Sequence, residues 1–214
     1  MDIYEAIYLR RDVREFTDQP VPDQLLTKIL DAAHHAGSVG FMQPWNFIVI
    51  RSQVTKEKIY QSFASANTDG AKRFSGDRGE LYKSLKLEGI REAPINIAVT
   101  CDHSRGGPHT LGRNTMPEMD IYSTCCAIQN LWLAARAEGI GVGWVSILDP
   151  IDVKSVLQIP RPITLVAYLC VGYPVAFLPK PLLEQVGWRD RLSLNEVIFL
   201  ETWPQTDQPQ QSDF

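Results

Sequence analysis

The sequence has few cysteines, no long apolar run and no excess of basic residues. Its four cysteines form no C-x-x-C pair, and its 21 basic residues are outnumbered by 25 acidic ones. The scarcity and spacing of the cysteines disfavour a disulfide framework, and the lack of a basic excess disfavours a nucleic-acid-binding surface. Apolar stretches such as 163–172 are about half as long as a membrane span, and residues 1–5 do not resemble a signal peptide. We expect a cytoplasmic protein that contacts neither nucleic acid nor membrane.

A recognisable metal-binding motif is also missing. Cys101, His103 and His109 lie near one another in the sequence, but their spacing matches no standard zinc set. Arg105 and Arg113 stand among these candidate ligands. We therefore expect no metal, and we expect the four cysteines to be buried structural thiols.

Nucleotide-binding signatures fail as well. Residues 139–143 read G-I-G-V-G, but this segment runs from a predicted helix into a predicted strand. A dinucleotide fingerprint runs in the opposite order, from strand into helix. No G-K-[ST] motif supports a P-loop. What remains is a tight turn into a strand, and the backbone near Ser146 can contact a bound ring.

The apolar periodicity that is present predicts one α+β domain over 1–203 with a mixed, mainly antiparallel sheet. Asp2 should cap a first helix that buries Ile3, Ala6 and Ile7, and Gly139 should end a long, buried helix. Further helices are expected to begin at 22–23 and at Thr55, and two others to span 119–138 and 152–157. The expected strands are 46–51, 95–100, 142–147 and 164–171. Residues 192–203 should form an arm with strand character, and 204–214 should be disordered.

Residues 62–92 carry mixed charge and several glycines without a clean period. A segment of this length is too long for a simple connector inside a compact domain. We expect either a functional lid or a helical insertion.

One carboxylate, Asp12, stands among Arg10, Arg11 and Arg14. Guanidiniums bind phosphate through charge-assisted forks, so the cluster indicates a phosphorylated ligand. Asp12 then either orients the arginines or takes part in chemistry on what they hold. The arginines should favour its ionised form. A solvated charged turn is the alternative.

A second polar segment, 37–47, follows a predicted helix and leads into a strand. Its glycines allow the backbone to approach a flat ligand, and Ser38, Gln43 and Asn46 offer hydrogen bonds. Pro44 should hold Trp45 rigidly. Trp45 is either part of a ring-binding wall or a core anchor.

These segments together resemble the flavin nitroreductase-like superfamily. The resemblance is carried by RRDVR (10–14), SVGFMQPWNF (38–47), SLKLEGIREAPINIAVTCD (84–102), MDIYSTCCAIQNLWLAARAEGIGVGWVSI (119–147) and GWRDRLSL (187–194). Within the superfamily the chain is similar to the enzymes that synthesise 5,6-dimethylbenzimidazole, in which aspartate replaces the usual serine at position 12. One departure is Gly37, where the family has proline before Ser38.

The resemblance implies an intertwined homodimer with flavin mononucleotide (FMN) at the subunit interface. It implies that Asp12 and Ser146 are catalytic, and that the flavin-binding set also includes Arg10, Arg11, Val13, Arg14, Ser38, Gln43, Trp45, Asn46 and Arg191. Of these, Arg191 joins Arg10, Arg11 and Arg14 in the phosphate grip.

The implied reaction is the dioxygen-dependent fragmentation of reduced FMN to 5,6-dimethylbenzimidazole and erythrose 4-phosphate, for the lower ligand of cobalamin. Reduced FMN is then the substrate, and a separate flavin reductase must supply it. Two alternatives stay open: an NAD(P)H-dependent nitroreductase or ene-reductase, and a non-enzymatic flavin-binding protein.

Overall fold

The structure is a computed structural model that describes residues 1–204. Its contacts divide the chain into two compact units, Met1–Pro179 and Lys180–Phe214. The sheet and most helices belong to the first unit, whereas the second contains α7 (Leu182–Gln185) and η2 (Leu194–Glu196). Apart from Pro204, the tail predicted over 204–214 lies outside the described residues.

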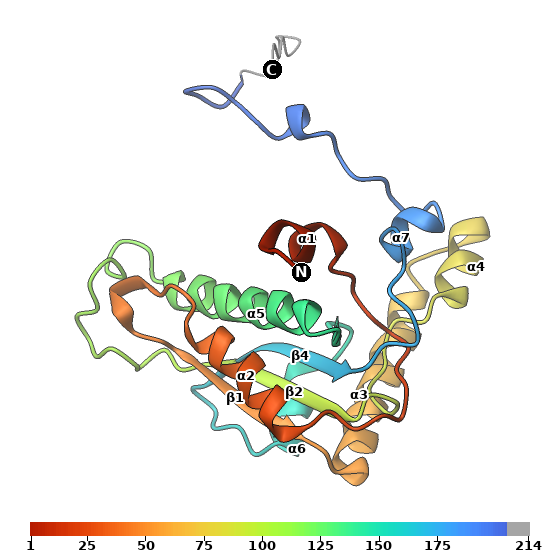
Figure 1. The fold of residues 1–214 in the computed structure, drawn as a ribbon, viewed down its shortest axis with the longest axis horizontal. Coiled ribbons are helices and arrows are strands. Elements are labelled where there is room, and N and C mark those ends of the chain that lie inside the picture. Colours follow the sequence, from red (N-terminus) through yellow and green to blue (C-terminus); the bar gives the residue numbers. More distant parts are fainter. Residues whose placement is uncertain (205–214) are drawn as a thin grey trace. The chain divides into compact units, whose positions relative to one another are not determined.

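A four-stranded sheet forms the centre of the first unit (Figure 1). Its order is β1 (Trp45–Ile50), β2 (Ile95–Cys101), β4 (Thr164–Gly172) and β3 (Gly141–Trp144), and all neighbours are antiparallel. One parallel bridge joins Asp12 to Val142. The predicted mixed, mainly antiparallel sheet is confirmed. The predicted third strand is shorter than expected, because it leaves the sheet after Trp144.

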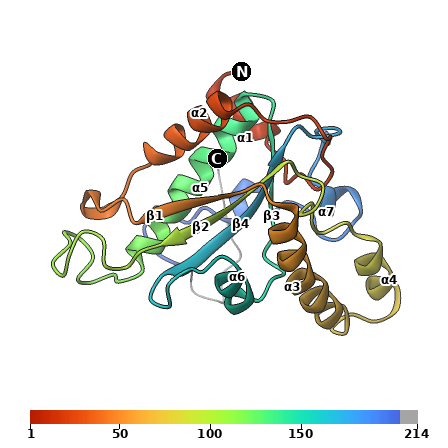
Figure 2. The ribbon, with the colours of Figure 1, turned by 90° about the horizontal axis from the view of Figure 1, so that it is seen from below.

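Helices cover both faces of this sheet, as Figure 2 shows. α2 (Asp23–His34) and α5 (Met119–Ala137) lie on one face, and α3 (Gln53–Ala71) and α6 (Pro150–Val156) lie on the other. Side chains alternate across a strand, so β2 serves both cores. Ile95, Ile97 and Val99 belong to the α2–α5 core, and Ala98 belongs to the α3–α6 core. All seven residues of β2 are buried.

The first helix, α1 (Ile3–Leu9), is capped as predicted. The Asp2 carboxylate accepts the Glu5 backbone N–H, and the Glu5 side chain accepts the Asp2 N–H. The predicted inner face is only partly correct, because Ala6 is buried whereas Ile3 and Ile7 are exposed.

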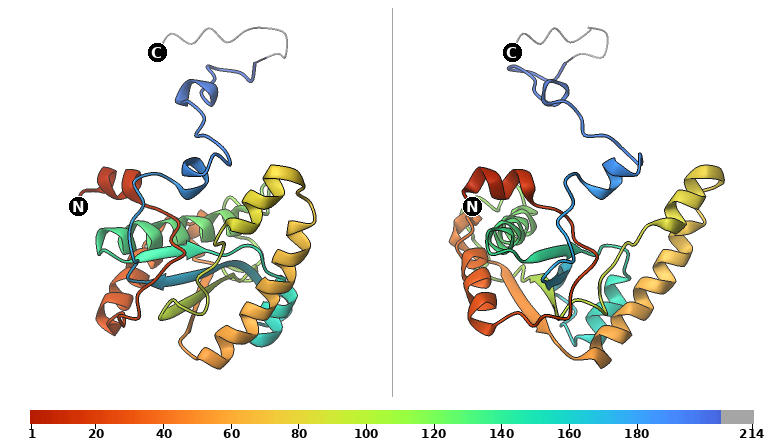
Figure 3. Two further views of the ribbon diagram at one scale, coloured as in Figure 1. Left: turned by 90° about the vertical axis from the view of Figure 1, so that its right-hand side faces the viewer. Right: turned by 45° about the vertical axis from the view of Figure 1, so that its right-hand side comes forward.

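The segment predicted to be a lid or a helical insertion is helical. α3 continues to Ala71, and α4 (Gly76–Ser84) follows after a short turn; Figure 3 shows α4 continuing from the far end of α3. Phe74 stacks on Tyr82 with ring centroids 5.0 Å apart, and the Tyr82 hydroxyl donates to Asn67 at 2.7 Å. These contacts join the two helices into one arm.

Two further predictions are wrong in part. Within 192–203 the structure shows the short helix η2 and no strand, because the described part of that segment pairs with no other strand. Cys101 and Cys170 are buried as expected, but Cys126 is exposed on α5. No helix in residues 1–204 is long and apolar enough to cross a membrane.

Candidate functional site

Asp12 is held against the β3 edge of the sheet by backbone contacts. The Val13 N–H donates to the Val142 carbonyl at 3.0 Å, and the Trp144 N–H donates to Asp12 Oδ1 at 2.8 Å. Gly143 permits this close approach, because a Cβ at that position would lie 2.0 Å from the Val13 carbonyl oxygen. The glycine-rich turn found in the sequence therefore serves to seat residues 12 and 13.

Arg14 completes this edge and leaves one donor unused. Its Nη2 pairs with Asp12 Oδ2 and also donates to the Trp144 carbonyl at 2.8 Å. Its Nη1 is buried and has no hydrogen-bond partner among the described residues. A buried guanidinium nitrogen without an acceptor is costly, and it is the kind of group that a bound anion satisfies. Arg10 lies nearby, with its guanidinium 4.5 Å from the Trp132 ring centroid.

The electrostatics of Asp12 differ from the expectation. Burial raises the pKa of the Asp12 carboxyl above its ordinary value, although Arg14, the Trp144 N–H and Arg10 lower it. Desolvation of the charged form outweighs the neighbouring guanidiniums. The arginines favour the ionised form as predicted, but burial outweighs them, so the net pKa of Asp12 is raised. A carboxylate with a raised pKa accepts a proton more readily.

The guanidinium of Arg11 is occupied by the chain itself. It donates to the carbonyls of Tyr8 at 2.8 Å, Leu178 at 3.0 Å and Pro179 at 2.6 Å. In this structure Arg11 ties the start of the chain to the end of the first unit. Arg191 lies in the second unit, where its side chain is exposed. Within the first unit, Arg14 offers a buried donor for an anion beside Asp12, and the roles of Arg10, Arg11 and Arg191 in binding phosphate remain predictions.

Loop 38–46, which we expect to contact flavin, has an unusual backbone. Phe41 and Gln43 adopt positive φ values of 51° and 47°, a conformation that costs non-glycine residues energy and is common at functional sites. The Ser38 hydroxyl accepts the Gln43 N–H at 3.1 Å and keeps its own proton available. The structure thus leaves Ser38 and Gln43 with side-chain groups that can contact a ligand.

Trp45 and Asn46 point inward in this structure, and their expected role as direct flavin contacts remains a prediction. Trp45 is 3% exposed, and its Nε1–H donates to His34 Nδ1 at 3.1 Å. The Asn46 amide donates to the Thr100 hydroxyl at 3.2 Å and accepts from Arg105 at 2.5 Å. Trp45 thus packs in the core, which is the alternative that the sequence left open.

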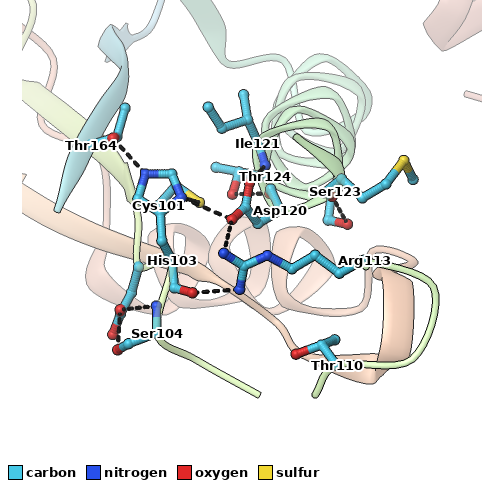
Figure 4. Close-up of polar contacts among 12 residues, drawn as sticks. Cys101, His103, Ser104, Thr110, Arg113, Asp120, Ile121, Ser123, Thr124 and Thr164 are labelled. Carbon is cyan, nitrogen blue, oxygen red and sulfur yellow. Dashed lines mark hydrogen bonds and ion pairs between the residues drawn. The ribbon is translucent and has the colours of Figure 1, made fainter. Parts of the chain in front are cut away.

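A polar cluster follows β2 near this loop (Figure 4). His103 Nδ1 lies 2.8 Å from Asp120 Oδ2, its Nε2 lies 2.7 Å from the Thr164 hydroxyl, and Arg113 pairs with Asp120 at 3.1 Å. Cys101 Sγ is 4.0 Å from His103 Nδ1, and burial raises the pKa of its thiol to about 11. These donor atoms could converge on a cation, but protein partners already satisfy the imidazole and the carboxylate. The geometry favours an anchor for the loop after β2, and the prediction of no metal remains a prediction.

Ser146 lies just beyond the end of β3, two residues after Trp144. Its side chain is exposed and lines a hollow of about 170 Å³ that Leu148, Leu165 and Tyr168 also border. It therefore follows the end of β3, where the Trp144 N–H also holds Asp12. Its catalytic role remains a prediction.

The two halves of the predicted site lie at opposite edges of the sheet. Trp45 begins β1, Trp144 ends β3, and the strand register places Trp144 in the row of Val49. Standard strand geometry separates Trp45 from Trp144 by about 13 Å along the strands and about 14 Å across them. Both faces between these edges are covered by helices and packed cores (Figure 2). One copy of the first unit therefore does not bring the two halves together.

Comparisons with known proteins identify the same fold and a closer similarity to one group of enzymes. A sequence model described as the nitroreductase family matches residues 7–173. The chain is 44% identical over 182 residues to a 5,6-dimethylbenzimidazole synthase of Rhodospirillum rubrum, covering 85% of this chain and 86% of that protein. It is 37% identical over 188 residues to one of Rhodobacter capsulatus, covering 88% and 91%. It is also similar to the structure of an oxidised iodotyrosine deiodinase bound to FMN and 3-iodo-L-tyrosine, with a TM-score of 0.74 and 23% identity over 92% of this chain and 100% of that one.

Proposed function

The chain belongs to the nitroreductase family, and from this premise we propose that it is a 5,6-dimethylbenzimidazole synthase. It uses dioxygen to fragment reduced FMN to 5,6-dimethylbenzimidazole and erythrose 4-phosphate. The identity of 44% to a curated synthase supports this assignment. The single structural observation that carries it is Asp12, a carboxylate with a raised pKa held beside an anion-seeking arginine.

The residues present fit a flavin phosphate. Arg14 Nη1 is buried and lacks an acceptor among the described residues, and a phosphate oxygen is an acceptor of the required charge. Arg10 supplies a second guanidinium on the same side, stacked on Trp132. We assign the phosphate grip to Arg10 and Arg14, and the parts expected of Arg11 and Arg191 remain predictions.

Reduced FMN supplies the reactive ring and the electrons that dioxygen accepts. The chain's own contribution begins with Asp12, whose Oδ1 is held by the Trp144 N–H and whose Oδ2 is held by Arg14. Each oxygen retains a lone pair, so the carboxylate is fixed in place and still able to take a proton from the ribityl carbon. Ser146 then offers a hydroxyl to a flavin nitrogen or to a developing oxyanion at the ring edge.

The site is completed by a second copy of the chain. The Asp12 edge and the 38–46 loop cannot meet within one first unit, whereas a twofold pairing of edges brings one copy's loop to the other's Asp12. Apolar side chains stand exposed where such a pairing would cover them: Ile3, Tyr4, Tyr8, Phe41, Leu111 and Tyr122. The homodimer implied by the resemblance is therefore part of the proposal.

The α3–α4 arm is proposed as the lid that excludes water from the reacting ring. We also propose a separate cytoplasmic flavin reductase, because reduced FMN is the substrate of the proposed reaction and must be supplied to the site. The rival nitroreductase would need NAD(P)H to reduce the bound flavin directly.

The test is to mix the purified protein with photoreduced FMN without oxygen, admit air, and follow products by mass spectrometry. We expect 5,6-dimethylbenzimidazole and erythrose 4-phosphate in molar excess over protein. Quantitative return of oxidised FMN with hydrogen peroxide, together with bleaching of bound flavin by NAD(P)H, would establish the reductase instead.

A further inference from the structure

The loop after β2 lies alongside the flavin-contacting loop 38–46, and Figures 1 and 2 show both at the same end of the sheet. The Asp102 N–H donates to the Pro44 carbonyl at 2.8 Å. At Gly40 an added Cβ would lie 2.5 Å from Thr110 Cγ2, so the two loops touch closely. The conformation of one loop therefore depends on the other.

Arg105 makes the main polar connection between them. Its Nη1 donates to the carbonyls of Gln43 at 2.9 Å and Trp45 at 2.8 Å, and its Nη2 donates to Asn46 Oδ1 at 2.5 Å. These three acceptors span the end of the flavin-contacting loop. A planar guanidinium matches such an array of acceptors, whereas a lysine ammonium offers one point charge.

The Arg105 contacts hold a backbone that would otherwise relax. Gln43 has a φ of 47°, and its carbonyl is one of the three acceptors. Strained conformations of this kind persist when several surrounding contacts hold them in place. Arg105 is the side chain that supplies those contacts from outside the loop.

Arg105 is itself anchored by the polar cluster of Figure 4. Arg113 donates to the His103 carbonyl and pairs with the buried Asp120. The Asp102 carboxylate accepts the Ser104 N–H at 2.9 Å and lies 3.9 Å from Arg105, where it offsets its charge. The base of the Arg105 loop is thus fixed to α5 and β2.

We propose that Arg105 is a positioning residue that sets the flavin-contacting loop, so that Ser38 and Gln43 meet the ring and ribityl chain. This inference rests on the proposed function. Arg105 acts through the loop and leaves the phosphate grip at Asp12 untouched. Its loss should weaken binding of the ring and ribityl chain without changing the recognition of the phosphate.

The test compares the affinities of FMN and riboflavin, which lacks the phosphate, by flavin fluorescence. We expect Arg105→Lys to weaken both flavins by the same factor, about 10- to 100-fold, the scale of charge-assisted hydrogen bonds. Arg14→Lys should instead weaken FMN far more than riboflavin. Arg51→Lys, which alters an exposed arginine that pairs with Asp23 beyond the far end of β1, is the matched control and should change neither affinity.

A second variant separates positioning from folding. In Arg105→Ala we expect millimolar guanidinium ion to restore flavin affinity, while the same concentration of sodium ion does not. Unchanged flavin affinity in Arg105→Lys, or a loss confined to FMN, would overturn the inference while the proposed function stands. Absence of flavin binding by the unaltered protein would instead overturn the proposed function, and the inference with it.

Discussion

The two edges of the sheet hold their functional residues by different means. At the β3 edge, Asp12 and Arg14 lie two residues apart in one short segment, and they contact each other and the Trp144 backbone. At the β1 edge, loop 38–46 is held from outside by Arg105, some sixty residues later in the chain. The first edge combines a local ion pair with long-range hydrogen bonds to the Trp144 backbone, whereas the second edge is held by a guanidinium that reaches its backbone carbonyls from a distant loop. The first edge therefore places groups that can react with a substrate, and the second sets the conformation of a loop that can contact it.

The largest expected effect comes from removing the charge at the first edge. Asp12→Asn keeps the shape of the carboxylate but cannot accept a proton, so product formation should fall about 10²- to 10⁴-fold. FMN affinity should change little, because Arg10 and Arg14 remain. Product yield is measured by mass spectrometry and affinity by fluorescence, and a variant with normal yield would remove Asp12 from the mechanism.

The next largest effect is expected at Arg14, the residue of the first edge that we propose binds the phosphate. Arg14→Lys keeps the charge but loses the fork that satisfies both Asp12 and the phosphate. FMN affinity should drop about 10- to 100-fold, while riboflavin affinity stays near its starting value. Equal losses for the two flavins would mean that Arg14 does not bind the phosphate.

Two glycines, one at each edge, allow a matched comparison of stability. Gly143→Ala forces a Cβ against the Val13 carbonyl, and Gly40→Ala adds a clash with Thr110 to a φ of 58°. Each should lower the free energy of unfolding by about 1–3 kcal/mol. Gly37→Ala is the control, since nothing lies within 4 Å of its added Cβ. Denaturant unfolding measures all three, and a control that is as unstable as the others would contradict the steric explanation.

The smallest expected effect is a pH dependence at the first edge. The folded-state pKa of Asp12 is raised above the reference value of 3.8, so the native state binds this proton more tightly than the unfolded state. The Asp12 contribution to stability is then fully present below that reference value and is lost as pH rises through the folded-state pKa. Thermal melting between about pH 4 and pH 7 should show Asp12→Asn gaining stability relative to the unaltered protein. A relative loss would mean that ionised Asp12 stabilises the fold.

The sequence predicted most of the first edge and little of the second. RRDVR is contiguous, so its charges must lie near one another in any fold, and the glycine turn that seats it follows a strongly periodic helix. The contacts of Arg105 could not be predicted, because they depend on how the loop after β2 meets β1. The inward orientation of Trp45 and Asn46 depends on the same packing, since residue type alone does not show which face a loop residue presents.

The elements were predicted well where local signals agreed with tertiary packing. The Asp2 cap, the glycine that follows the end of α5 and the short apolar runs of the core strands all have such signals. The exposed Ile3 and Ile7 on α1 were misassigned because an apolar helical face does not say whether it packs within the chain or against a second copy. The strand expected within 192–203 failed for a related reason, since β propensity without a pairing strand forms no ladder.

The most direct test of the split site uses a dimer assembled from two different defective chains. One chain carries Asp12→Asn, and the other carries Ser38→Asp in the loop; each alone should form an inactive homodimer. Heterodimers are isolated through two affinity tags and supplied with photoreduced FMN and air. If each site takes Asp12 from one chain and loop 38–46 from the other, one of the two sites is intact, and about half of the normal yield of 5,6-dimethylbenzimidazole should appear. No product from the heterodimer would show that each chain forms its own site and would contradict the account.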